Sequence, residues 1–171
     1  KSMNLKDKIT DYPNFPKKGI LFRDFSPILK DPSALSYVAD EFSKYFHPKD
    51  IDTFAGIESR GFILASILAS RYNKGMTMIR KAGKLPPPTL AQNINKYDGE
   101  AVIEIEDYGD YSGMKILNWD DVIGSGGTEL GIREIFDSVG AEVVQSVYLI
   151  GVPAEGYVEK NIPNVMMFLN Y

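Results

Sequence analysis

Residues 118–128 carry the sequence NWDDVIGSGGT, and this stretch decides how the chain folds. A predicted strand over residues 115–119 leads into two adjacent carboxylates, Asp120 and Asp121. Five small residues follow, and a helical pattern begins near Gly127. A strand, a tight turn and a helix in this order are typical of α/β proteins, whose ligands bind beyond the carboxyl ends of the strands. We therefore expect a ligand site at this turn.

The small residues of the turn suit a phosphate group. Without large side chains, the backbone N–H groups approach an anion closely, and the helix N-terminus adds a positive partial charge. The two acids would repel a phosphate, but they accept hydrogen bonds from vicinal hydroxyls or bind a divalent cation. A ribose 5-phosphate satisfies both requirements. We expect its diol on Asp120 and Asp121 and its phosphate on Gly124, Ser125, Gly126, Gly127 and Thr128.

Length and composition limit the other classes of function. The chain has 171 residues, of which 44% are hydrophobic, and this suits one domain with a substantial core. Its net charge of -4 argues against nucleic acid as a partner. The absence of cysteine excludes a disulfide framework and a thiol nucleophile. No apolar run approaches the ~18 residues of a membrane span. We expect a soluble, cytoplasmic protein with no membrane partner.

Short apolar runs alternate with helical patterns along the chain. Strands are predicted at residues 52–57, 75–80, 101–106, 115–119 and 142–152. Helices are predicted from Asp31, over residues 61–72, and from Gly127 to a stop at Gly140. The first helix should bury a stripe formed by Leu35, Val38, Phe42 and Phe46. Residues 81–100, rich in Pro, Lys, Asn and Gln, should form a long loop or lid. The pattern predicts an α/β fold, with a twisted, mainly parallel sheet of about five strands flanked by helices.

A second turn has the same construction as the first. Glu58, Ser59, Arg60 and Gly61 follow a predicted buried strand and open a helix, so this turn also suits an anion. Arg80, Lys81 and Lys84 then place three cations within five residues at the end of another strand.

Four segments together resemble a known family. WDDVIGSGGT is similar to the 5-phosphoribosyl 1-diphosphate (PRPP) motif of type I phosphoribosyltransferases. FPKKGILFRDFSPILKDP (residues 15–32), AGIESRGF (55–62) and RKAGKLP (80–86) resemble the adenine phosphoribosyltransferases, in the same order and spacing. The resemblance implies a single type I phosphoribosyltransferase domain over residues 1–171, with a small N-terminal hood at about residues 1–35 and a flexible lid at about residues 81–100.

The resemblance also implies a reaction and its partners. Adenine and PRPP would give AMP and diphosphate, a purine salvage step, and Mg2+ would be the cofactor. The metal would be held mainly by substrate and water, near Asp120 and Asp121, with no direct protein ligand. Family members form homodimers, so the same is expected here.

The resemblance assigns roles to further residues. Leu21, Phe22 and Arg23 match the adenine site. Arg60 and Lys84 would assist catalysis by neutralising the leaving group. The diphosphate would be bound by Glu58, Ser59, Arg60, Arg80, Lys81 and Lys84.

The chain departs from the family in the lid. The family carries Glu-Tyr-Gly there, and that Glu is implied in proton transfer at the purine. This chain has Tyr97, Asp98 and Gly99, so Asp98 and Glu100 are the candidate replacements, with Tyr97 as another hydrogen-bond donor. The lid change keeps two alternatives open: a 6-oxopurine substrate such as hypoxanthine or guanine, and a non-catalytic regulator that binds PRPP or nucleotide.

Three other positions also differ from the family. Asn118 and Trp119 replace β-branched residues just before the acids, and Trp119 suits either core packing or a contact in the site. Gly151 stands at a strand end where the family often has an acid. The single histidine, His47, is expected to be exposed and without a catalytic role.

Overall fold

The computed structural model describes residues 2–96, 99–152 and 161–171. The chain divides into two compact units, Lys1–Lys44 and Tyr45–Tyr171. The second unit contains the sheet and both predicted anion-binding turns.

The first unit combines a hairpin with two helices. After the short 3-10 helix η1 (Leu5–Lys8), strands β1 (Thr10–Pro13) and β2 (Leu21–Asp24) pair in antiparallel fashion. Helices α1 (Ser26–Lys30) and α2 (Pro32–Phe42) follow.

The predicted start of α2 is confirmed. The Asp31 carboxylate accepts hydrogen bonds from the N–H groups of Ser33 and Ala34, and a proline occupies the first position of the helix. The prediction that Phe46 continues the buried stripe is wrong, because α2 ends at Phe42 and the 3-10 helix η2 (Ser43–Tyr45) follows. Phe46 belongs to the second unit, where its ring packs against Phe54 at a centroid distance of 5.4 Å.

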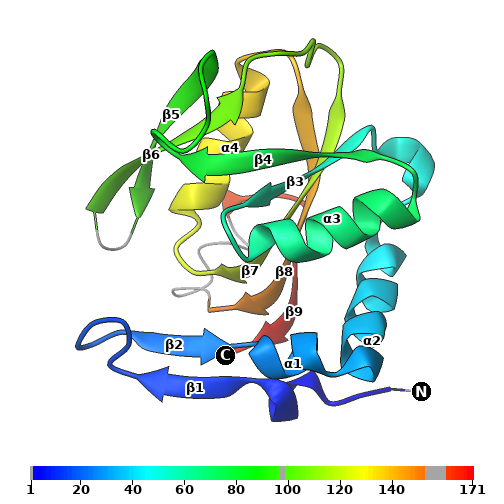
Figure 1. Ribbon diagram of the computed structural model, residues 1–171, viewed down its shortest axis with the longest axis vertical. Helices are drawn as coiled ribbons and strands as arrows, with labels where there is room; N and C mark the ends of the chain where they lie inside the picture. The colour runs from blue at the N-terminus through cyan, green and yellow to red at the C-terminus, as the bar shows by residue number, and fades with distance from the viewer. Residues whose placement is uncertain (1, 97–98, 153–160) are drawn as a thin grey trace. The chain divides into compact units, whose positions relative to one another are not determined.

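The second unit is built on a mixed sheet with a parallel centre. Among the described residues it has seven strands in the order β5-β6-β4-β3-β7-β8-β9, and α3 and α4 lie on its opposite faces (Figure 1). The bounds are η3 Pro48–Asp50, β3 Thr53–Ile57, α3 Gly61–Arg71, β4 Gly75–Lys81, β5 Thr89–Lys96, β6 Gly99–Glu106, β7 Lys115–Ile123, α4 Gly127–Asp137, β8 Glu142–Gly151 and β9 Val165–Asn170.

The predicted fold class is confirmed by the pairing of these strands. In the described part of the chain, the five strands β4, β3, β7, β8 and β9 are parallel neighbours. Strands β6 and β5 extend the sheet in antiparallel fashion beyond β4.

The prediction of an unbroken loop over residues 81–100 is wrong. Residues 89–96 form β5, which pairs with β6 over eight residue pairs from Thr89↔Glu106 to Lys96↔Gly99. The segment is polar because β5 is an edge strand with several exposed residues, and the pairing is supplied by a neighbour that the local pattern does not show. The remaining part, residues 82–88, is a turn.

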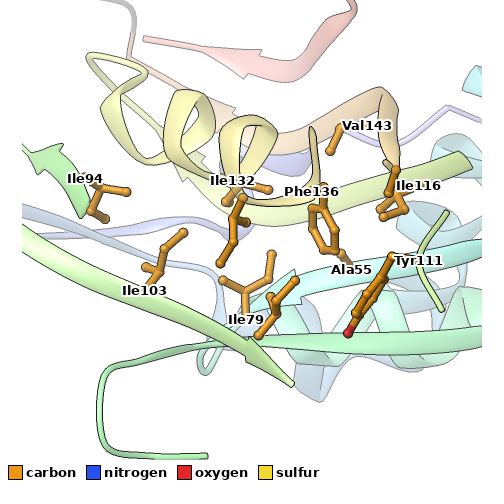
Figure 2. Packing of buried hydrophobic residues seen from close by; sticks show 12 residues of the cluster. Ala55, Ile79, Ile94, Ile103, Tyr111, Ile116, Ile132, Phe136 and Val143 are labelled. Atoms are coloured by element: carbon orange, nitrogen blue, oxygen red, sulfur yellow. The ribbon is translucent and has the colours of Figure 1, made fainter. Parts of the chain in front are cut away.

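The core beneath α4 fixes this helix to the sheet. Figure 2 shows Ile132 and Phe136 of α4 pointing toward Ile79 and Ile103 of the sheet, all 0–2% exposed. Burial of side chains of this size contributes roughly 1.5–3 kcal/mol each. Because β3, β4, β7 and β8 are parallel, their carboxyl ends meet at one edge, and the starts of α3 and α4 are held beside that edge.

Candidate active site

A cavity of about 410 Å³ opens at the carboxyl ends of the parallel strands. It lies within the second unit, and both predicted anion-binding turns reach it. It is lined by Ile57, Glu58, Arg60, Lys81, Ile94, Lys96, Ala101, Ile103, residues 120–129 and Tyr148.

Residues 124–128 form one wall of this cavity, and we call them the phosphate loop after their predicted ligand. Gly126 has a φ of 90°, a left-handed conformation that favours glycine, and it caps the start of α4. A side chain at Gly127 would meet the backbone of β5, since a Cβ there would lie 2.9 Å from the carbonyl carbon of Asn95. The first turn of a helix leaves backbone N–H groups without intrahelical partners. The loop therefore has the backbone geometry of an anion site.

Asp120 and Asp121 form the neighbouring wall, as the last part of β7 rather than a loop after it. The Asp120 Oδ1 accepts a hydrogen bond from the Asp121 N–H at 2.8 Å. Loss of hydration in this position, together with the Asp121 carboxylate, raises the pKa of Asp120 well above its ordinary value. The pair can thus hold a proton and still present oxygen atoms to the hydroxyls of a ligand.

Arg60 lies beside the acids. Its Nε is 2.7 Å from the Asp121 Oδ2, and the Asp121 side chain is 4% exposed, whereas that of Arg60 is 44% exposed. This ion pair links the first turn, at the start of α3, to the end of β7. Arg60 also lines the cavity, where its positive charge can attract an anion.

Glu58 forms hydrogen bonds with two residues of β4. Its carboxylate accepts from the Arg80 Nη2 at 3.1 Å and from the Lys81 backbone N–H. Partial burial acts to raise the pKa of Glu58, but these two hydrogen bonds outweigh burial and lower it. Glu58 therefore pairs with the Arg80 side chain and with the Lys81 backbone, and Lys81 lines the cavity.

Lys84 stands in an anchored turn after β4. Glu104 of β6 accepts hydrogen bonds from the Gly83 N–H at 2.6 Å and from the Thr89 hydroxyl. One carboxylate therefore binds the turn and also the first residue of β5, which follows the turn. The Arg80 Nη1 also lies 3.5 Å from the Lys84 carbonyl oxygen. Lys84 itself is exposed and does not line the cavity.

The other predicted site residues lie in different places. Ser59 is exposed in the Arg60 turn, and Glu100 is exposed near the start of β6. Asp98 lies outside the described residues. Of the three purine-site residues, which belong to the first unit, Leu21 is 44% exposed and Phe22 packs edge-on against Phe15.

The third purine-site residue, Arg23, has an acidic neighbour on the hairpin. Its Nε lies 3.8 Å from the Asp11 Oδ1. The purine-site assignment stays a prediction.

Two departures from the family pattern have a physical explanation. Trp119 is 1% exposed and forms part of the core, which favours core packing over a contact in the site. At Gly151, an added Cβ would lie 2.8 Å from the Met167 Cγ, so Met167 of β9 fills the space that a side chain would need. His47 is exposed, as predicted, and its Nδ1 accepts a hydrogen bond from the Lys49 N–H.

Three polar residues of the cavity were not predicted from the sequence: Lys96, Glu129 and Tyr148. Lys96 lies in a polar segment without clear periodicity. Glu129 has the position of an ordinary first-turn acid, and Tyr148 stands in an apolar strand. Only the strand register, which pairs Tyr148 with Asp120, brings this tyrosine to the site.

The fold and this cavity define a phosphoribosyl transferase domain. The family model with the description "Phosphoribosyl transferase domain" matches residues 28–170, which is most of the chain.

Comparison with individual proteins narrows the class. The chain is 60% identical over 148 residues to an adenine phosphoribosyltransferase of Nitrosopumilus maritimus, covering 86% of this chain and 87% of the relative. The crystal structure of adenine phosphoribosyltransferase from Rhodothermus marinus matches with a TM-score of 0.90 at 35% identity, covering 98% of this chain and 96% of the other.

A third comparison includes bound ligands. The crystal structure of adenine phosphoribosyltransferase from Saccharomyces cerevisiae matches with a TM-score of 0.83 at 30% identity, covering 96% of this chain and 95% of the other. That structure is a complex with adenine and D-2,5-dideoxy-2,5-imino-altritol 1,6-bisphosphate. The chain belongs to the adenine phosphoribosyltransferase family, as the four sequence segments predict. Among the helices that the structure describes, none combines the length and the hydrophobicity of a membrane span.

Proposed function

We propose that this chain catalyses the reaction of adenine with PRPP to give AMP and diphosphate, a step of purine salvage that depends on Mg2+. One observation carries the proposal: the phosphate loop, the acids Asp120 and Asp121, and the cations Arg60 and Lys81 all line one cavity. A phosphorylated ribose with a charged leaving group needs these three kinds of contact together.

Each part of the cavity suits one part of PRPP. The phosphate loop would bind the 5-phosphate through backbone N–H groups. Asp120 and Asp121 would accept hydrogen bonds from the ribose diol. Arg60 and Lys81, assisted by Lys84 and Arg80, would neutralise the diphosphate as it leaves. Most of the rate acceleration would then come from positioning and electrostatics.

The acids also fit the implied Mg2+. Carboxylate oxygens are the donor type that this ion prefers, and Asp120 and Asp121 present them at the cavity beside the expected ribose position. When bound, the ion would supply positive charge to the diphosphate oxygens. The protein residues would hold it through the substrate and water.

Arg60 would change partners during binding. In the protein alone it pairs with the nearly buried Asp121, and this pairing keeps both groups in position. A diphosphate would attract the exposed side of the same guanidinium. Asp121 would then accept its hydrogen bonds from the ribose hydroxyls instead.

Proton transfer at the purine has two candidate residues. Asp98 and Glu100 remain predictions for this role, and Leu21, Phe22 and Arg23 remain predictions for binding adenine. Support for adenine as the base comes from the relatives: the 60% identical protein is an adenine phosphoribosyltransferase, and the yeast structure is a complex with adenine.

The test is AMP formation from adenine, PRPP and Mg2+ by the wild type and by Asp121→Ala. The wild type should turn over, and the variant should lose at least about 100-fold in kcat/KM for PRPP. Asp137→Ala is the matched control, because Asp137 is an exposed acid at the other end of α4. Unchanged turnover by Asp121→Ala would overturn the assignment of the acids.

Assembly and location are further parts of the proposal. The family resemblance supports a homodimer that works in the cytoplasm. Sedimentation or light scattering of the purified chain gives its mass directly, and a monomer at micromolar concentration would contradict the dimer.

A further inference from the structure

A cluster of buried polar side chains lies beside the phosphate loop. Glu129 of α4, Asn118 of β7 and Ser146 of β8 are all 0% exposed, and Tyr148 of β8 is 2% exposed. Burying a carboxylate and several neutral polar groups costs free energy unless they are well paired. A cluster of this kind in the wall of a ligand cavity calls for a functional explanation.

Glu129 is the centre of the cluster. The Tyr148 hydroxyl donates a hydrogen bond to the Glu129 Oε1 at 3.2 Å, and the Arg133 Nε lies 3.7 Å from the Oε2, one helical turn further along. Burial raises the pKa of Glu129, and Ser146, Arg133, Tyr148 and Asn118 all act to lower it. Asn118 and Ser146 are therefore polar neighbours of this buried carboxyl group.

The bond between Glu129 and Tyr148 connects two parts of the cavity. Glu129 directly follows Thr128, the last residue of the phosphate loop, so it belongs to the turn whose N–H groups would face the phosphate. Tyr148 is the register partner of Asp120 on the neighbouring strand. Both residues line the cavity. The bond therefore ties the first turn of α4 to the strand beside the ribose acids.

We propose that Glu129 and Tyr148 are positioning residues for PRPP. Their hydrogen bond fixes the start of α4, and hence the N–H groups of the phosphate loop, at a set distance from Asp120. The inference rests on the proposed function, because it assigns the loop to the 5-phosphate of PRPP.

Tyr148→Phe removes this bond and keeps the ring. A hydrogen bond of this kind is worth a factor of about 3 to 10 in affinity, so the KM and the dissociation constant for PRPP should rise about 3- to 10-fold. The KM for adenine should change less than twofold. Calorimetry with PRPP and Mg2+, steady-state kinetics and the Tm are measured on the same preparations.

Tyr111→Phe is the matched control. Tyr111 is also a buried tyrosine, 5% exposed, and its hydroxyl also bonds to a glutamate, donating to the Glu106 backbone oxygen at 2.8 Å. It precedes β7, at the end of the sheet away from the cavity. A role limited to stability would lower the Tm in both variants and leave the KM for PRPP unchanged in both.

Substitutions of Glu129 test the other partner. Glu129→Gln keeps the shape and an oxygen that accepts from Tyr148, so affinity for PRPP should stay within about twofold of the wild type. Glu129→Leu removes the acceptor and should reproduce the effect of Tyr148→Phe. The double variant Glu129→Leu with Tyr148→Phe should bind PRPP as tightly as either single variant, because each substitution removes the same hydrogen bond.

The outcomes separate this inference from the proposed function. If the wild type binds and uses PRPP, and Tyr148→Phe does so equally well, the inference is wrong and the function stands. If Glu129→Gln lowers the affinity for PRPP as much as Glu129→Leu does, the loss of the hydrogen bond does not cause the lower affinity, and the inference is wrong. If the wild type itself fails to bind PRPP, the proposed function is wrong and the inference falls with it.

Discussion

Gly56→Ala should damage both stability and activity through one close contact. Gly56 is buried in β3, directly opposite the first residue of α3. An added Cβ would lie 2.7 Å from the carbonyl carbon of Gly61, and the carbonyl oxygen is nearer still. Ordinary contact begins at 3.4 Å, so the backbone at the start of α3 must move by at least 0.7 Å.

The size of the effect follows from this displacement. Overpacking against backbone costs about 1–3 kcal/mol, which corresponds to a fall in Tm of about 2–12 °C for a chain of this length. Because α3 begins next to Arg60, the guanidinium moves with the helix. A misplacement approaching 1 Å at a charged contact is expected to reduce kcat/KM for PRPP by about 10- to 100-fold.

Gly75→Ala is the matched control in the same sheet. Gly75 opens β4, its φ is not positive, and the nearest atom to an added Cβ is the Thr53 Oγ1 at 3.8 Å. This variant should keep the wild-type Tm and kcat/KM. The assay is thermal unfolding followed by circular dichroism, with AMP formation measured on the same samples. A Gly56→Ala protein that behaves like Gly75→Ala would refute the close-contact argument.

Three further perturbations test other contacts. Arg60→Gln should lower kcat/KM for PRPP by about 100-fold or more. Arg60→Lys should restore only part of this loss, because lysine lacks the planar guanidinium group that donates two parallel hydrogen bonds. A wild-type kcat/KM for Arg60→Lys would contradict this expectation. The Thr89 and Gly83 hydrogen bonds lower the pKa of Glu104, so their stabilisation is present above the ordinary value of 4.5 and is lost as pH falls through the lower folded-state value. Glu104→Gln should therefore lower the Tm at neutral pH, with the difference from wild type shrinking below pH 4.5, and a constant difference would argue against the anchored turn. EDTA should stop turnover yet leave the Tm unchanged, because in the described ranges no three His, Cys, Asp or Glu side chains gather into a metal site; a lower Tm would point to a resident metal.

The sequence predicts well those features that depend on neighbours along the chain. The cap at Asp31, the small residues of the phosphate loop and the acids of β7 are each read from a few adjacent positions. Their physical causes are local: a carboxylate bonding the N–H groups two and three residues later, and a helix start that needs glycine. The mainly parallel sheet followed from the alternation of such elements.

Features that depend on pairing across the chain were not predicted. β5 has a polar sequence and becomes a strand only because β6 pairs with it. No strand was predicted before residue 52, although β1 and β2 form a hairpin there. β9 was not predicted either, and its place beside β8 explains why Gly151 has no room for a side chain.

In the candidate site, too, single residues were predicted from local patterns, whereas the contacts between distant residues were not. Arg60, Asp120 and Asp121 were assigned correctly to one edge of the sheet, but the ion pair between Arg60 and Asp121 joins residues 61 positions apart. Glu58 and Arg80 are 22 positions apart, and no pattern of adjacent residues indicates that they pair. Tyr148 reaches Glu129 only through the register of β8 on β7.

The most direct test of the central claim is a competition between purines. The protein is mixed with PRPP, Mg2+ and equal concentrations of adenine, hypoxanthine and guanine, and the nucleotide products are separated and quantified. We predict that AMP is the main product and that diphosphate is released in equal amount. IMP or GMP as the main product would contradict adenine as the substrate, and PRPP binding with no nucleotide formed would make the chain a regulator instead of an enzyme.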